Sequence, residues 1–234
     1  MNSSFFTNPE KSLATYHECG FHIEENVFDD DDCAKLIAAS INLENAKNNT
    51  FKPQMMPHRQ DRIYFEAMRK KALVDIMNYL INGKAMGLQT EFFYCKPGTR
   101  GFSLHQDNFF VQAQIGTFAS AWIALTDTYP EKGGLIVYPG TQKEGLLPVR
   151  KLNLEKDLSQ DPNANNEEVV VPEKYAPIHA SVKKGAVLFI HGHLVHGSNT
   201  NQTNDWRYVL LNTYIRQGEY FRPGNYAQRE ALEL

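Results

Sequence analysis

Two neighbouring stretches decide the fold class: FASAWIALT at residues 118–126 and GGLIVYPGT at residues 133–141. Both contain runs of aromatic, aliphatic and β-branched residues, which favour strands. Gly133-Gly134 and Pro139-Gly140 flank the second run and are typical of turns. The pattern therefore predicts two short strands, Phe118–Thr126 and Leu135–Tyr138, separated by a turn.

Similar runs extend the β pattern in both directions along the chain. The further predicted strands are Phe92–Cys95, Val187–His191 and Trp206–Ile215. Turn residues follow or precede each of them, as at Pro97-Gly98 and Lys184-Gly185. Many short strands separated by turns indicate a mainly β protein, built as a sandwich or a barrel.

The first third of the sequence has the spacing of helices instead. Leu36, Ile37 and Ile41 recur at helical intervals after the acidic run 29–32, where negative charge favours the start of a helix. Residues 73–80 repeat the pattern. We therefore expect a single domain over residues 1–234, in which a helical part of about residues 1–85 packs against one sheet.

Composition excludes several classes of protein. The net charge is −3 and no long basic run is present, so a nucleic-acid partner is not expected. Residues 1–10 lack the apolar run of a signal peptide, and no stretch has the ~18 apolar residues of a membrane span. Cys19, Cys33 and Cys95 are widely spaced, which predicts reduced thiols in a cytoplasmic protein. The polar segment 153–168 is predicted to be a surface loop.

His105-Gln106-Asp107 is the first candidate for chemistry. In an extended segment, residues i and i+2 share a face, so the imidazole of His105 and the carboxylate of Asp107 can converge on one point. Two histidines and one carboxylate on one face of an octahedral iron leave positions open for oxygen chemistry. The pair alone is weak evidence, because a surface loop would also explain it.

The segment HGHLVH at residues 191–196 offers three candidates for the second histidine. His191 ends an apolar run and could be a core histidine, whereas His193 follows a glycine in a predicted bend. His196 opens a polar stretch and is favoured, with His193 as the next choice. Spacing alone leaves this choice open.

Arg207 and Trp122 are candidates for a binding pocket. Arg207 alternates onto the strand face of Val209, Leu211 and Thr213, where a charge is rare unless it is paired. It is either a structural ion-pair residue or a clamp for a ligand carboxylate. Trp122 shares its strand face with polar groups, as expected where a barrel interior is a site and not a filled core.

Four motifs in this order resemble the phytanoyl-CoA dioxygenase family of iron(II)- and 2-oxoglutarate-dependent enzymes. They are His105-Gln106-Asp107, the GGLIVYPGT stretch, the segment from Lys184-Gly185 to His196-Gly197-Ser198, and Arg207, eleven residues beyond His196. The resemblance covers about residues 16 to 217. It implies a double-stranded β-helix, that is, a cupin-like jelly-roll with flanking helices.

The resemblance also implies roles for individual residues. Fe(II), which reacts with O2, would be held by His105, Asp107 and His196. The co-substrate 2-oxoglutarate would be bound by Arg207 and Ser198 and lined by Gln106, Trp122 and Phe92. A related halogenase branch has a small residue in place of the carboxylate ligand, so Asp107 favours hydroxylation or another oxidation, with release of succinate and CO2. The alternatives are a zinc hydrolase or isomerase on a similar barrel and a metal-dependent binding or sensor protein.

The substrate is expected to be a small polar or amphipathic molecule. The basic pairs Arg150-Lys151 and Lys183-Lys184 are isolated, which disfavours the phosphorylated handle of a CoA thioester. Residues 108–117 and 142–176 are candidate lids. The predicted substrate contacts are Asn108, Phe110, Gln112 and Tyr138. No membrane or nucleic-acid partner is expected, and monomer and homodimer remain equally open.

Overall fold

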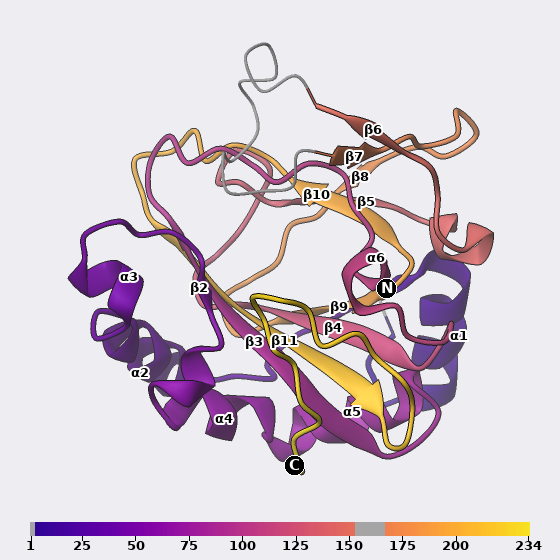
Figure 1. Cartoon of the computed structure of the whole chain (residues 1–234), viewed down its shortest axis with the longest axis horizontal. Helices are drawn as coiled ribbons and strands as arrows, with labels where there is room; N and C mark the ends of the chain where they lie inside the picture. The colour runs from indigo at the N-terminus through magenta and orange to yellow at the C-terminus, as the bar shows by residue number, and fades with distance from the viewer. Residues whose placement is uncertain (1–2, 153–166) are drawn as a thin grey trace.

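A six-stranded antiparallel sheet forms the floor of the molecule (Figure 1). The computed structural model describes residues 3–152 and 167–234. The strand order in this sheet is β1-β9-β4-β11-β3-β2. The strands are β1 (Phe21–Glu24), β9 (Val187–His191), β4 (Phe118–Ala124), β11 (Arg207–Arg216), β3 (Ala85–Cys95) and β2 (Gln54–Met55).

A smaller sheet lies above the floor and completes a jelly-roll (Figure 1). Its order is β10-β5-β8, with β10 (Val195–Ser198), β5 (Leu135–Tyr138) and β8 (Ile178–His179). Apolar side chains join the two sheets, because Leu135 and Val137 of β5 pack in one cluster with Trp122, Leu188 and Val209 of the floor. A separate hairpin pairs β6 (Val149–Lys151) with β7 (Glu167–Val169).

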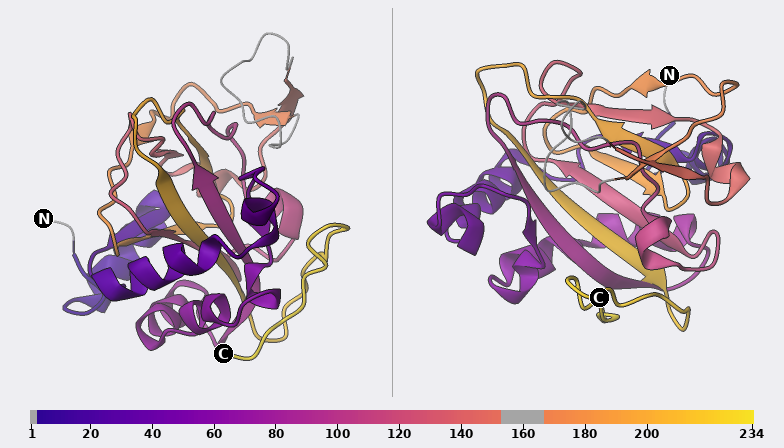
Figure 2. Two further views of the ribbon diagram at one scale, coloured as in Figure 1. Left: turned by 90° about the vertical axis from the view of Figure 1, so that its left-hand side faces the viewer. Right: turned by 45° about the horizontal axis from the view of Figure 1, so that its top comes forward.

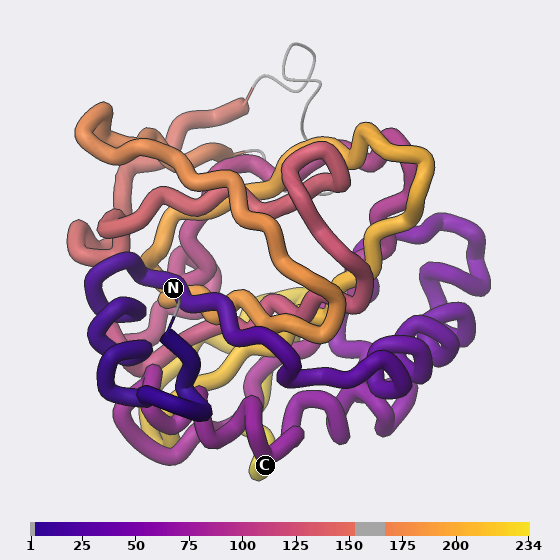
Figure 3. The backbone as a smooth tube through the Cα atoms, turned by 180° about the vertical axis from the view of Figure 1, so that it is seen from behind, coloured from indigo at the N-terminus to yellow at the C-terminus, as the bar shows by residue number. Residues whose placement is uncertain are grey.

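Helices cover the outer face of the six-stranded sheet (Figures 1 and 3). They are α1 (Pro9–Cys19), α2 (Asp30–Ser40), α3 (Glu44–Lys47), α4 (Ile63–Met68) and α5 (Lys71–Leu80). Leu73 and Ile76 of α5 pack in the largest apolar cluster with Phe92 and Phe189 of the sheet. The helix α5 of the N-terminal part therefore packs against this sheet. No helix in residues 3–152 and 167–234 is long and apolar enough to cross a membrane.

The acidic run 29–32 starts α2 as predicted. Asp29 is the N-cap residue, and its side chain accepts a hydrogen bond from the backbone N–H of Asp32 at 2.8 Å. The Asp32 carboxylate accepts in return from the backbone N–H of Asp29, which completes a capping box. These contacts satisfy backbone donors that the first helical turn would otherwise leave free.

The chain closes the fold with short helices and a C-terminal segment. The helix α6 (Asn108–Val111) follows the His105-Gln106-Asp107 motif, and the 3-10 helices are η1 (Pro57–Arg59) and η2 (Thr141–Glu144). After β11, the C-terminal segment (yellow in Figures 1 and 2) crosses in front of β3 and β11, and Leu232 bridges to Gly87. The predicted surface loop 153–168 lies outside the described residues except for Glu167 and Glu168, which belong to β7.

Candidate metal and co-substrate site

His105, Asp107 and His196 converge between the two sheets. One ligand atom from each lies within 4.8 Å of the other two. Asp107 Oδ1 is 3.5 Å from His105 Nε2 and 3.6 Å from His196 Nε2. The backbones of His105 and His196 exchange hydrogen bonds of 2.8 and 3.0 Å, so β10 carries its histidine to the HxD motif. His193 lies elsewhere, 3.0 Å from the Asn108 side chain.

The hydrogen bonds of the two imidazoles suit a metal ligand. His105 Nδ1 lies 2.7 Å from the carbonyl of Ser103, and His196 Nδ1 lies 3.1 Å from the carbonyl of Leu194. A carbonyl only accepts, so each Nδ1 carries the proton and each Nε2 of a neutral ring keeps a lone pair toward Asp107. Two imidazole donors and one carboxylate match the facial triad of non-haem iron, so the residues fit an iron(II) ion.

Burial and mutual charge set the protonation of the three groups. Burial, and then the charge on His105, lower the pKa of His196 to about 4, which favours its neutral form at pH 7. Burial acts to raise the pKa of Asp107, but His196 and His105 outweigh it and hold that pKa well below its usual range. Burial acts to lower the pKa of His105, yet its hydrogen bond to Asp107 raises it. A carboxylate that stays ionised and a neutral imidazole are the forms that bind metal.

Ser120 of β4 forms a hydrogen bond with the carboxylate of Asp107. Its hydroxyl donates to Asp107 Oδ2 at 2.5 Å, which leaves Oδ1 toward the two histidines. We expect Ser120→Ala to weaken iron(II) binding by roughly 10- to 100-fold, as is typical when a partner of a metal ligand is removed. Anaerobic titration calorimetry would measure the change. The control is Ser40→Ala, which removes a buried serine hydroxyl in α2 and should leave the affinity for iron(II) unchanged. An unchanged affinity for iron(II) in Ser120→Ala would contradict the role of Ser120 in orienting Asp107.

Arg207 begins β11 and is almost fully buried in the same cavity. Its Nη1 donates to the carbonyl of Gly133 at 2.6 Å and its Nη2 to Cys95 Sγ at 2.5 Å, and the guanidinium lies 5.7 Å from the Trp122 ring centroid. Gly133 has a φ of +76°, which few other residues adopt without strain. Nε of Arg207 has no hydrogen-bond partner, and no carboxylate of the described residues lies within 4 Å of the guanidinium. A buried guanidinium without a carboxylate fits the distal carboxylate of 2-oxoglutarate.

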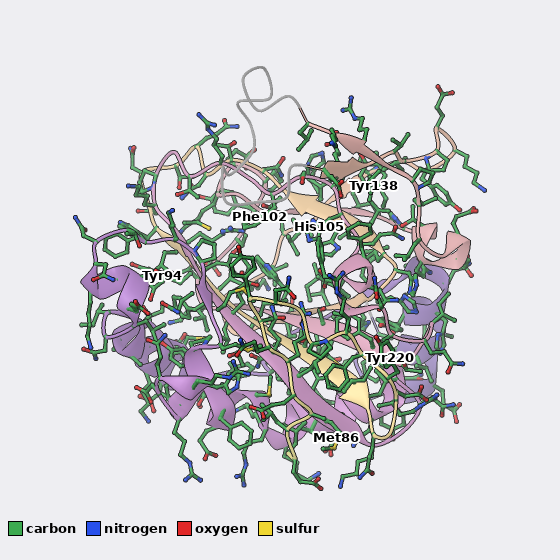
Figure 4. The ribbon with its side chains drawn as sticks, in the orientation of Figure 1. Met86, Tyr94, Phe102, His105, Tyr138 and Tyr220 are labelled. Carbon is green, nitrogen blue, oxygen red and sulfur yellow. The ribbon has the colours of Figure 1, made fainter. Side chains whose placement is uncertain are left out.

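The cavity around these residues has a volume of about 890 Å³, within the range of small-molecule sites. Of the predicted residues, it is lined by His105, Asp107, His196, Arg207, Ser198, Trp122 and Phe110. Figure 4 shows His105 and Phe102 near the centre of the molecule, between the sheets. The predicted lid 108–117 reaches the cavity through Phe110 and Val111, whereas the lid 142–176 lies in part outside the described residues.

The structure places two predicted co-substrate contacts, Phe92 and Gln106, outside the cavity lining. Phe92 is fully buried in the apolar cluster between β3 and the helices, 5.8 Å from the Tyr64 ring. Its neighbours Glu91 and Phe93 line the cavity instead, because successive residues of a strand face opposite sides. Gln106 is buried beside the loop 145–147: its Nε2 donates to the carbonyls of Gly145 and His193, and its Oε1 accepts from the backbone N–H of Leu147.

Three predicted substrate contacts also lie outside the cavity wall. The Asn108 side chain is held by the backbone of Ala113 and by His193. Gln112 is exposed, with a φ of +55° at the end of α6. Tyr138 lies on β5, on the side of the β6–β7 hairpin (Figure 4). Burial raises the pKa of its hydroxyl, and the charge of Glu168 raises that pKa further. The cavity lining therefore contains none of these three predicted contacts.

The contacts of Gln106 predict a structural role. We expect Gln106→Ala to lower the free energy of unfolding by about 1–3 kcal/mol, because it leaves buried backbone groups without partners. Chemical denaturation would measure this loss. The KM for 2-oxoglutarate should stay unchanged in folded protein; a tenfold rise in KM at unchanged stability would show that the side chain reaches the co-substrate.

Sequence reasoning missed the charged end of the cavity. Gln89 and Glu91 of β3, Thr213 of β11, and Arg222 and Arg229 of the C-terminal segment all line it. Burial, and then the charge on Asp107, raise the pKa of Glu91 to about 7. Alternation along β3 could have placed Glu91 on the cavity face, but no local pattern brings the C-terminal segment back over the sheet.

Comparison with known proteins identifies the family. Residues 16–209 match the family described as phytanoyl-CoA dioxygenase (PhyH). Phytanoyl-CoA dioxygenase 1 of Oryza sativa subsp. japonica is 25% identical over 231 residues, covering 98% of this chain and 75% of the rice protein. Phytanoyl-CoA dioxygenase domain-containing protein 1 of Danio rerio is 32% identical over 146 residues, covering 60% of this chain and 49% of the fish protein.

Solved structures share the fold at low sequence identity. The 2-oxoglutarate-dependent carbocyclase SnoK from nogalamycin biosynthesis aligns with a TM-score of 0.74 and 16% identity, over 96% of this chain and 90% of SnoK. EctD from S. alaskensis, solved with 2-oxoglutarate and 5-hydroxyectoine, aligns with a TM-score of 0.66 and 19% identity, over 88% of this chain and 76% of EctD. The jelly-roll is thus confirmed. The match over residues 16–209 shows that this chain belongs to the phytanoyl-CoA dioxygenase family of iron- and 2-oxoglutarate-dependent dioxygenases.

Proposed function

We propose that this protein hydroxylates an unactivated C–H bond of a small polar or amphipathic metabolite, using iron(II), O2 and 2-oxoglutarate and releasing succinate and CO2. The observation that carries the proposal is the shared cavity. Three metal-type ligands and a buried arginine with an unpartnered Nε line the same space. A zinc hydrolase or isomerase would use the three ligands but would leave Arg207 without an anion to bind.

Each residue has a defined task in this proposal. His105, Asp107 and His196 would hold the iron, with Ser120 orienting Asp107. Arg207 would bind the distal carboxylate of 2-oxoglutarate, and Ser198, whose hydroxyl oxygen accepts from the Phe102 N–H at 2.9 Å, can donate its own proton to the same group. When both are bound, iron and 2-oxoglutarate would activate O2 for the oxidation of a C–H bond. The walls made by Trp122, Phe93 and Leu211 exclude water from the reacting carbon.

Product analysis under ¹⁸O2 tests the outcome of the reaction. Purified protein with iron(II) and 2-oxoglutarate should release succinate in air, and a hydroxylated product should contain one ¹⁸O atom. A zinc enzyme or a sensor would release no succinate. Among the structural neighbours, SnoN is an epimerase and SnoK is a carbocyclase. Succinate release together with a product that contains no ¹⁸O would therefore indicate an oxidation such as epimerisation or ring closure, and not hydroxylation.

A further inference from the structure

Glu91 is a carboxylate on the cavity face of β3 that has no cationic partner. Its neighbour across β3 and β11 is Leu211, and among the described residues its side chain accepts one hydrogen bond, from Gln89 Nε2 at 3.4 Å. No Lys or Arg nitrogen of residues 3–152 and 167–234 lies within 4 Å of it, although Arg229 acts on it at longer range. Glu91 is half-buried, so its carboxylate is partly removed from water without a counter-ion, and a cation in the cavity would stabilise its ionised form.

Two arginines of the C-terminal segment face the same cavity without a carboxylate partner. Arg229 Nε donates to Gln89 Oε1 at 2.7 Å, and its Nη1 donates to backbone carbonyls, including that of Arg222 at 3.2 Å. Within the described part of the chain, Arg229 Nη2 and the whole Arg222 guanidinium form no hydrogen bond or ion pair. Burial lowers the pKa of Arg229 below its usual value, against the charges of Asp107 and Glu91, and the like charge of Arg222 adds to the lowering. Hydrogen bonds to neutral groups therefore hold Arg229 beside the cavity, whereas Arg222 lines the same cavity as an exposed residue.

Thr213 adds a neutral hydrogen-bonding group between these charges. It pairs with Gln89 on one side and with Ser120 on the other, which places it on the cavity face of β11. Its hydroxyl is buried and has no hydrogen-bond partner. A buried hydroxyl of this kind gains from a ligand that supplies a partner.

We propose that this end of the cavity binds the two charges of an amino carboxylate: the ammonium on Glu91 and Thr213, and the carboxylate on Arg222 and Arg229. The inference rests on the proposed function, because it places the substrate beside the metal ligands. The carboxylate and the two guanidinium groups line one cavity but form no ion pair with each other. A zwitterion supplies a counter-charge to both ends, whereas an anion alone supplies none to Glu91 and a cation alone supplies none to the half-buried Arg229.

A panel of free amino acids tests the substrate class in the iron-loaded protein. The panel contains the common α-amino acids and the β-, γ-, δ- and ε-amino acids, so the separation of the two charges varies. We expect at least one member to stimulate succinate release about tenfold or more over the rate without substrate. Its N-acetyl derivative and its methyl ester should each lose about tenfold or more in kcat/KM, because each removes one charged contact.

Two variants should separate the two ends of the ligand. Glu91→Gln should lower the preference for the free amine over the N-acetyl form by about tenfold, while the preference for the carboxylate over the ester is retained. Arg222→Gln should do the reverse. Glu173→Gln, which changes an exposed carboxylate outside the cavity wall, should alter neither preference.

The outcomes distinguish this inference from the proposed function. If 2-oxoglutarate binds and basal succinate is released, but no amino acid stimulates release, the inference is wrong and the proposed function stands. Equal turnover of the amine and its N-acetyl form would also overturn it. If iron-loaded protein neither binds 2-oxoglutarate nor releases succinate, the proposed function itself is wrong.

Discussion

Asp107→Ala is expected to abolish succinate formation and to remove most of the bound iron. The variant takes away the only carboxylate among the three metal-type ligands and leaves two imidazoles. It also leaves the Ser120 hydroxyl without its partner. Iron per folded protein, measured by atomic absorption after anaerobic loading, should fall well below that of the wild type. His105→Ala and His196→Ala should behave in the same way.

His193 provides the matched control for this prediction. It is a buried histidine only three residues from His196, and it contacts the Asn108 amide instead of the metal ligands. His193→Gln can still accept that hydrogen bond, so its iron content should stay near the wild-type value. Loss of iron in His193→Gln, with retention in His196→Ala, would show that the wrong histidine has been assigned to the metal.

The strands of the fold could be predicted because their sequences are short apolar runs between turns. β5 and β9 have the predicted bounds, and β4 and β11 differ from them by one or two residues. β10 was not predicted, because Val195–Ser198 contains glycine and serine and has no apolar run of its own. Its pairing with β5 holds it in the sheet, and that contact is not encoded locally.

The candidate site shows the same division between local and long-range information. Alternation predicted that His105 and Asp107 share a face, and the same rule places Gln106 on the other side, where it holds a loop. The run EFFYC at residues 91–95 has aromatic residues on both faces, so its composition could not show that Phe92 faces the helices. The arginines at 222 and 229 follow the last strand, and only the tertiary fold brings them to Glu91.

Arg207→Ala should chiefly raise the concentration of 2-oxoglutarate that the enzyme needs. Losing a charge-assisted contact with the distal carboxylate should cost about 2–5 kcal/mol. That cost corresponds to a KM for 2-oxoglutarate at least roughly 30-fold higher. Arg207→Lys keeps the charge but lacks the planar fork, so it should recover only part of the affinity. Iron binding should change little, because no metal-type ligand contacts the guanidinium.

The alternative role of Arg207 is structural, and the two roles predict different measurements. Its bonds to Gly133 and Cys95 join the GGLIVY turn to the end of β3, so Arg207→Ala should also lower stability to some extent. Arg216→Ala is the matched control, because Arg216 ends the same strand and pairs with Glu219 away from the cavity. A stability loss in Arg207→Ala at unchanged KM for 2-oxoglutarate would make this arginine a scaffold residue. A large rise in the KM for 2-oxoglutarate in the Arg207 variants, but not in Arg216→Ala, would assign Arg207 to the co-substrate. Partial recovery of affinity in Arg207→Lys would support this role, because a scaffold defect alone gives no reason for lysine to restore affinity.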